Sequence, residues 1–181
     1  AREDIYMKAY GPPKTALIHG PISFSGIGES CCTSIEALNI LYDEGLIEQA
    51  SIRGSYLLDR LHDIKSKYPR MIKAVRGQGL MVGVEFCDFS KTFPLGMGKI
   101  FSGLDERLKG SVCGFVGSLL LREYDVLVAF TEYNRNVIRL EPPLIVTNDQ
   151  IDTFINALDD LLSRGITKII MRYAKYFRQR K

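Results

Sequence analysis

The sequence of 181 residues predicts an α/β fold in which helices cover a small β-sheet. Three patterns support this prediction. Apolar residues recur at helical spacing from Leu46 to Ile64, which is typical of a long amphipathic helix. Two short apolar runs, 71–75 and 80–86, flank the glycine-rich segment 76–79 and are typical of strands joined by a turn. Thr147 and Gln150 have capping-box spacing ahead of a further amphipathic segment.

Short elements and breaks alternate in the N-terminal quarter of the chain. We expect a strand at 15–18, a loop rich in Gly, Ser and Pro at 19–28, and a helix at 29–41. Gly45 interrupts the helical pattern and separates this helix from the one that begins at Leu46.

The second half of the chain begins with an irregular segment. Glycine and proline interrupt every periodic pattern from 88 to 110, which predicts a long loop or insertion. A buried helix is expected at 111–124, and short strands at 126–130 and 137–140. The capped helix then follows from Thr147 to Leu162.

Composition is typical of a globular protein, with 46% hydrophobic and 25% charged residues. No run of about 18 apolar residues predicts a membrane span, and the start of the chain shows no secretory leader. No C-x-x-C pair is present, so a zinc site is not expected. We therefore expect reduced thiols and a cytoplasmic location. The residues concerned are Cys31, Cys32, Cys87, Cys113, His19 and His62.

The C-terminal segment is strongly basic. From Arg164 to Lys181 there are seven Lys or Arg residues and no acidic residue. Apolar residues from Ile166 to Phe177 recur at helical spacing, so a basic amphipathic helix is expected. Such a helix binds an anionic membrane surface, a partner groove or nucleic acid, or it packs on the body with a solvated charged face.

Arg139 is the first candidate for a functional side chain. It lies between Ile138 and Leu140 in an apolar strand that Pro142 ends. A guanidinium in apolar surroundings must find a carboxylate or lose its water at a cost of several kcal/mol. Two interpretations follow: an internal structural ion pair, or recognition of a ligand carboxylate in a site.

Other candidates carry weaker signals. The loop 23–28 precedes a helix whose N-terminal amides suit a phosphate, but Glu29 competes for the same dipole and no Walker A or G-x-G-x-x-G pattern is present. Arg76 lies in a glycine turn, where a structural role is the simpler interpretation. His19 is a conceivable general base, yet no nucleophile with a third orienting group accompanies it.

Three blocks of sequence carry a family resemblance. They are HGPISFSGIGESC at 19–31, VRGQGLMVGVE at 75–85 and NVIRLEPPL at 136–144. In order and spacing they resemble the C-terminal part of the class III pyridoxal-phosphate aminotransferases, over roughly residues 1–164. The Glu-Pro-Pro form of the last block is most similar to the putrescine and diamine branch, with the ornithine and acetylornithine branch also close.

The resemblance implies a fold-type I transferase with pyridoxal 5′-phosphate as its cofactor. It implies that the Ser23 hydroxyl and the neighbouring backbone at Phe24 hold the cofactor phosphate of the other subunit across a dimer interface. Ile22 and Ile27 depart from the family pattern at this loop. Arg139 falls on the family's arginine that faces the substrate or pairs with an active-site glutamate, and Arg76 falls in a structural hairpin.

The family's Schiff-base lysine lies upstream of the first residue here, so no catalytic residue is assigned. We expect the C-terminal portion of an enzyme, either a cloned fragment or a truncated product, that neither holds the cofactor nor reacts alone. In the complete enzyme an amino group passes from an amine or amino acid to a 2-oxo acid. The expected parts are a large-domain remnant with the interface loop at 1–45, a small α/β domain at 46–164 and a basic amphipathic tail at 165–181.

Self-association is expected, as a homodimer or a higher assembly, because the remnant would otherwise expose apolar residues. The alternative hypothesis is a non-catalytic binding or regulatory module that kept this fold. Its basic tail would then contact anionic lipid or nucleic acid.

Overall fold

A computed structural model describes residues 2–10, 28–87 and 112–178. The chain divides into two compact units, Ala1–Asp43 and Glu44–Lys181. The strand expected at 15–18, nearly all of the loop at 19–28 and the irregular segment at 88–110 lie outside the described residues.

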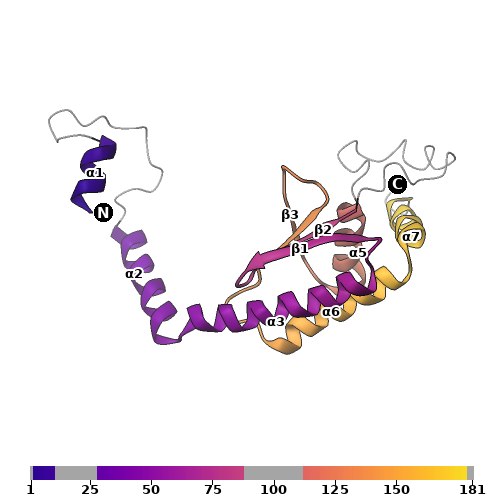
Figure 1. Cartoon of the computed structure of the whole chain (residues 1–181), viewed down its shortest axis with the longest axis horizontal. Coiled ribbons are helices and arrows are strands. Elements are labelled where there is room, and N and C mark those ends of the chain that lie inside the picture. The colour runs from indigo at the N-terminus through magenta and orange to yellow at the C-terminus, as the bar shows by residue number, and fades with distance from the viewer. Residues whose placement is uncertain (1, 11–27, 88–111, 179–181) are drawn as a thin grey trace. The chain divides into compact units, whose positions relative to one another are not determined.

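The first unit contains two described helices, α1 (Glu3–Tyr10) and α2 (Gly28–Asp43) (Figure 1). The helix predicted at 29–41 is confirmed as α2 and extends by one or two residues at each end. None of the residues of α2 is buried, and Ile35 and Leu38 are more than half exposed.

The second unit contains the sheet. It begins with α3 (Leu46–Lys67), preceded by Gly45 in a left-handed conformation with φ of 60°. The strands β1 (Ile72–Gln78), β2 (Met81–Phe86), β3 (Ala129–Phe130) and β4 (Val137–Leu140) follow. They form one antiparallel sheet in the order β1-β2-β4-β3. The prediction of an α/β fold is confirmed.

The first hairpin differs from its prediction. We expected the turn at 76–79, but β1 continues to Gln78, which pairs with Met81. The turn is therefore Gly79-Leu80, and Gly79 has φ of 54°, a conformation that favours glycine. The second half of β1, Arg76-Gly77-Gln78, contains no apolar side chain, so the pattern of apolar residues did not predict it as strand.

β3 is much shorter than the strand predicted at 126–130. Ala129 pairs with Arg139, so continuing the register would place Val126 opposite Pro142. Proline has no N–H to donate to a strand ladder, and a second proline follows it. The ladder could therefore not include Val126; it already ends at Ala129, and the chain before it separates from β4.

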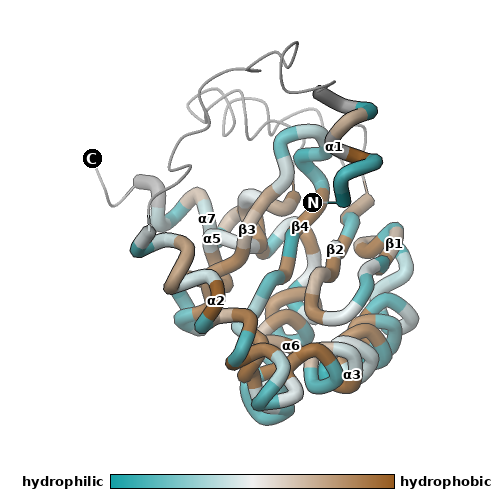
Figure 2. The backbone as a smooth tube through the Cα atoms, turned by 90° about the vertical axis from the view of Figure 1, so that its left-hand side faces the viewer, coloured by the Kyte–Doolittle hydropathy of each residue, from teal (hydrophilic) through white to brown (hydrophobic). Residues whose placement is uncertain are grey.

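Helices cover one face of the sheet (Figure 1). These are α3, α5 (Val112–Tyr124) and α6 (Asn148–Ser163), and α7 (Ile166–Arg178) packs against α5 and α6. Hydrophobic and hydrophilic residues alternate along α3 and α6, as Figure 2 shows, and the apolar positions enter the core. Val75, Val82, Val84, Ile138 and Leu140 supply the core from the sheet.

The predicted capping box at the start of α6 is confirmed. The Thr147 hydroxyl accepts a hydrogen bond from the Gln150 backbone N–H, and the Gln150 side chain accepts one from Thr147. Both bonds satisfy N–H groups that a helix start otherwise leaves unpaired.

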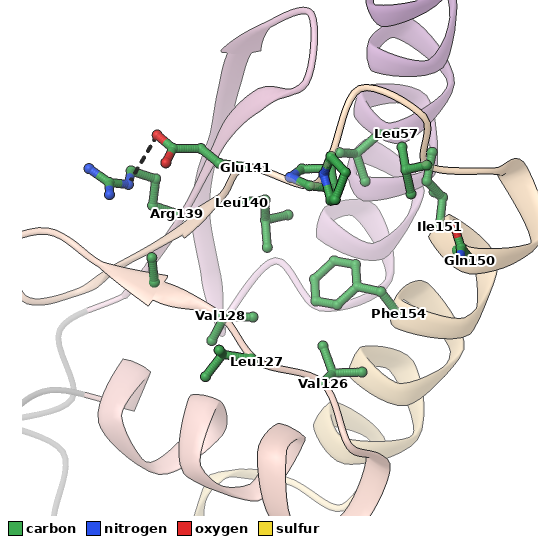
Figure 3. A pocket seen from close by; sticks show the side chains of 14 residues that line it. Leu57, Val126, Leu127, Val128, Arg139, Leu140, Glu141, Gln150, Ile151 and Phe154 are labelled. Atoms are coloured by element: carbon green, nitrogen blue, oxygen red, sulfur yellow. Dashed lines mark ion pairs between the residues drawn. The ribbon is translucent and has the colours of Figure 1, made fainter. Parts of the chain in front are cut away.

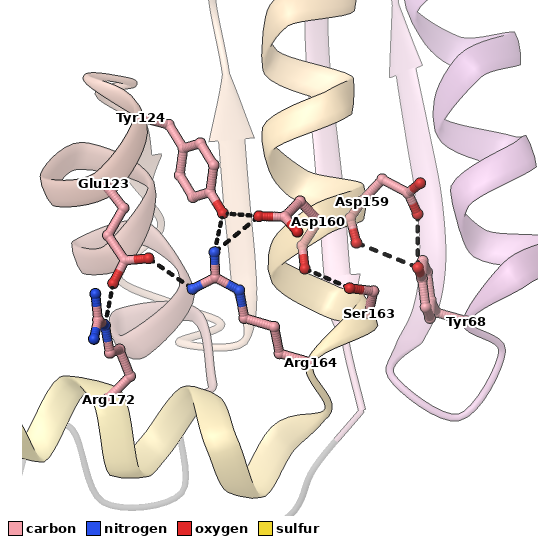
Figure 4. Close-up of polar contacts among 8 residues, drawn as sticks. All are labelled: Tyr68, Glu123, Tyr124, Asp159, Asp160, Ser163, Arg164 and Arg172. Carbon is pink, nitrogen blue, oxygen red and sulfur yellow. Dashed lines mark hydrogen bonds and ion pairs between the residues drawn. The ribbon is translucent and has the colours of Figure 1, made fainter.

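The basic C-terminal helix packs on the body of the second unit. Ile169 and Ile170 of α7 are almost fully buried, and Tyr173 contacts Phe115 edge to face at 5.0 Å between ring centroids. Glu123 on α5 accepts from Arg164 at 2.6 Å and from Arg172 at 2.7 Å (Figure 4). The apolar face of α7 is therefore occupied within the protein.

Candidate functional site

Arg139 is positioned by strand alternation. Its neighbours Ile138 and Leu140 point into the core, so Arg139 points to the opposite side of the sheet. Its side chain is 49% exposed, so it keeps much of its contact with water, and it also pairs with a carboxylate, which is the first of the two outcomes expected from the sequence. We call this side the open face of the sheet; it carries Ala74, Arg76, Gly83, Arg139 and Ala129, which the strand register brings together.

Glu141 is the carboxylate that pairs with Arg139. Its Oε1 atom lies 3.1 Å from Arg139 Nε. The sequence contained a signal for this pair, because residues two apart in an extended chain lie on one face. The contact occupies the Nε side of the guanidinium. The Nη1 and Nη2 groups have no partner among the described residues, and together they form an edge that fits a carboxylate with two hydrogen bonds.

A cavity of about 480 Å³ opens beside this ion pair, where the chain before β3 separates from β4. Its lining is mostly apolar, and Phe154, Leu140 and Val126 surround its centre (Figure 3). The guanidinium of Arg139 points away from Phe154 in this view. The cavity has the size and apolar character of a small-molecule site, with charged groups only at its edge.

A second charged cluster lies on the open face. Glu85 accepts from Lys73 at 2.7 Å and from Arg76 at 2.6 Å, and its side chain is only 10% exposed. Lys73 first, and then Arg76, lower the pKa of Glu85 to about 2. The carboxylate is therefore ionised at any physiological pH, and Arg76 is held across the hairpin rather than at its turn.

None of the remaining sequence candidates in the described part of the chain lines the cavity beside Arg139. Ser23, Phe24 and His19 lie outside the described residues. Cys31 and Cys32 are exposed on α2, Cys113 is buried in α5, and His62 is exposed on α3. Among the described residues, no group of three or more metal-ligating side chains could hold a metal ion. No helix in this part of the chain is long and apolar enough to cross a membrane.

Comparison with known proteins decides the family. The sequence model of the class-III aminotransferases matches residues 3–162. The chain belongs to this family. Among its class-III aminotransferase relatives, a putrescine aminotransferase of Pectobacterium atrosepticum is 28% identical over 142 residues, or 78% of this chain. The mitochondrial alanine–glyoxylate aminotransferase 2 homolog 2 of Arabidopsis thaliana is 31% identical over 142 residues and the same share.

Solved structures of transaminases share the fold of this class-III aminotransferase chain. An (S)-enantioselective omega-transaminase from Thermomicrobium roseum matches 90% of the chain with a TM-score of 0.64 and 22% identity. A Bacillus anthracis aminotransferase matches 91% with a TM-score of 0.63 and 23% identity. The chain covers 32% and 34% of these two structures, respectively. It spans 26% and 27% of the two curated relatives, about a quarter of their length.

The class-III aminotransferases use pyridoxal phosphate, which needs an amine for its aldehyde and several donors for its phosphate. The described lysines do not fit this requirement. Lys67 pairs with Asp159 and Lys73 with Glu85, and no described lysine lines the cavity beside Arg139. The described part of this class-III aminotransferase therefore has a half-exposed arginine beside an apolar cavity but not a complete cofactor site.

Proposed function

We propose that this chain is the C-terminal part of a pyridoxal-phosphate-dependent aminotransferase that transfers an amino group from an amine or amino acid to a 2-oxo acid. The observation that carries the proposal is Arg139, on the open face of a domain that matches the family over 3–162. Both curated relatives are named as aminotransferases, one for a diamine and one for an amino acid. The chain itself is inactive without a lysine-bearing part.

The role of Arg139 is to bind the carboxylate of a substrate. Glu141 fixes the guanidinium through Nε, and the Nη1 and Nη2 groups face outward with half of the side chain exposed. Two parallel hydrogen bonds from such an edge give both affinity and a defined orientation. An apolar cavity lies beside the Arg139–Glu141 ion pair, and its lining suits uncharged carbon atoms.

Ser23 and Phe24 hold the cofactor phosphate in the complete enzyme, across a homodimer interface, in the cytoplasm. This part of the proposal rests on the motif at 19–31 alone. The division into a remnant at 1–45, a small domain at 46–164 and a basic segment at 165–181 belongs to the same proposal. Light scattering tests the assembly, and a monomer at micromolar concentration would contradict the dimer.

The experiment for Arg139 is a titration of the whole chain with pyruvate, a 2-oxo acid with one carboxylate. Arginine side-chain NMR signals report binding at the guanidinium itself. We expect the Arg139 Nε and Nη signals to shift with pyruvate, and the shift to disappear in Arg139→Ala. Arg70→Ala is the matched control. Arg70 is exposed in the turn before β1, and its replacement removes the same charge as Arg139→Ala does. Pyruvate binding that survives in Arg139→Ala would remove the basis of the assignment.

The chain with added pyridoxal phosphate and an amine donor provides a second test. No amino transfer is expected, since the resemblance places the imine-forming lysine upstream of residue 1. Turnover by this chain alone, with a lysine-dependent imine absorption band, would contradict the proposal.

A further inference from the structure

Gly83 occupies the centre of the open face. It is in the middle of β2, opposite Arg76 on β1 and Arg139 on β4. Strand register therefore places two arginines in one row with a glycine between them, followed by Ala129 on β3. Both arginine side chains are about half exposed, at 58% and 49%.

The fold does not require a glycine at this position. A Cβ atom on Gly83 would lie 3.4 Å from Val137 Cγ1 and 3.8 Å from the Arg76 carbonyl oxygen, which are ordinary contacts. Its φ angle is not positive. At Gly77, by contrast, a Cβ would lie within 2.8 Å of the Val82 Cα atom. A glycine inside a strand weakens the strand and often marks a place that a ligand approaches closely.

The Cα atoms of the two arginines lie on opposite sides of Gly83, on the two neighbouring strands. Neighbouring strands are about 4.8 Å apart, so the Cα atoms of Arg76 and Arg139 are separated by roughly 10 Å. Arg76 uses Nη1 to bind Glu85, and Arg139 uses Nε to bind Glu141. Each guanidinium keeps N–H groups without a partner among the described residues.

The charge balance of the open face favours an anion. Lys73, Arg76 and Arg139 supply three positive charges, and Glu85 and Glu141 supply two negative ones. The excess is one positive charge around an uncharged, side-chain-free centre. A ligand with two anionic groups joined by a short carbon chain matches two donors at this separation better than one compact anion does.

We propose that Arg76 is a specificity-determining residue, and that Arg76 and Arg139 together bind a dicarboxylic 2-oxo acid across Gly83. Arg139 takes the carboxylate next to the keto group, and Arg76 takes the distal carboxylate. The identity of the ligand as a 2-oxo acid rests on the proposed function. The assignment of Arg76 rests on the strand register, on the glycine between the two arginines and on N–H groups that have no partner among the described residues.

Titration of the whole chain with two 2-oxo acids tests this assignment. The probes are 2-oxoglutarate, which has two carboxylates, and pyruvate, which has one; inorganic phosphate serves as the compact anion. We expect 2-oxoglutarate to bind at least about tenfold more tightly than pyruvate, the factor that one additional charge-assisted contact supplies. Arg76→Ala removes this preference and leaves the pyruvate affinity unchanged. Arg70→Ala, which removes an equal charge elsewhere, keeps the preference.

Further variants separate this inference from the proposed function. Arg139→Ala loses pyruvate binding, which tests the proposed function, whereas Arg76→Ala affects only the dicarboxylate. Gly83→Val places a side chain between the two arginines and is expected to weaken 2-oxoglutarate binding; its thermal melt shows whether it folds. Equal affinity for the two acids, equal losses in Arg76→Ala and Arg70→Ala, or phosphate binding as tight as that of 2-oxoglutarate would each overturn the inference.

Discussion

Replacement of Gly54 by alanine is expected to destabilise the second unit, although it improves the intrinsic helix propensity of α3. Gly54 is buried where α3 crosses the turn of the β1–β2 hairpin. A Cβ atom on Gly54 would fall on the carbonyl group of Gly79 and lie 2.5 Å from the Gly79 Cα atom. Both groups belong to backbone, so no flexible side chain can move aside.

The magnitude follows from two opposing terms. Alanine in place of glycine inside a helix gains about 1 kcal/mol in the free energy of unfolding. Overpacking in a filled core costs about 1–3 kcal/mol, and the upper end applies because α3 or the hairpin backbone must shift. The expected net loss is therefore ~2 kcal/mol, which lowers the melting temperature by ~4–8 °C for a chain of this size.

Urea denaturation followed by far-UV circular dichroism measures this loss. The matched control is Ser51→Ala on the exposed side of the same helix, where a change within about 0.5 kcal/mol is expected. If Gly54→Ala is as stable as the wild-type chain or as the control, α3 does not approach the hairpin in the way described. The open face, whose register depends on that hairpin, would then need another explanation.

Three further outcomes are expected. The lowered pKa of Glu85 means that its ion pairs stabilise the fold above the ordinary pKa of 4.5 and lose this effect as the pH falls toward 2. Glu85→Gln is therefore less stable by ~0.5–1 kcal/mol at neutral pH, and urea midpoints of variant and wild type should converge on acidification. Glu123→Ala leaves two guanidiniums without their shared carboxylate and should raise amide hydrogen exchange in α7 more than in α3, whereas equal increases would contradict the ion-pair account. Burial raises the pKa of Cys113 to about 12, so a thiol reagent should modify the exposed Cys31 and Cys32 rapidly and Cys113 only after denaturation.

The basic amphipathic pattern of the C-terminal helix allowed several interpretations, and the structure favours one of them. Its sequence fitted a membrane-binding helix as well as a helix docked on the body. The buried Ile169 and Ile170 and the carboxylate of Glu123 favour docking, because the first two occupy the apolar face of α7 and Glu123 pairs with its Arg172. Glu123 is 41 residues from Arg164 and 49 residues from Arg172 in the sequence, and periodicity does not report contacts at such separations.

By itself, the sequence determined the helices α2, α3, α5, α6 and α7, the Val137–Leu140 strand, the Thr147 capping box and the family, whereas the helix α1 was not expected. These depend on local spacing and on motifs that lie within a few residues of one another. Only the tertiary structure decided that Arg139 is half exposed, that the strand before Ala129 separates from β4, and that Arg76 and Arg139 share a row with Gly83. The physical reason is that these facts depend on which strands pair and in which register. Such pairing joins residues that are distant in the sequence, and the local pattern of apolar residues in one strand does not report which strand it pairs with.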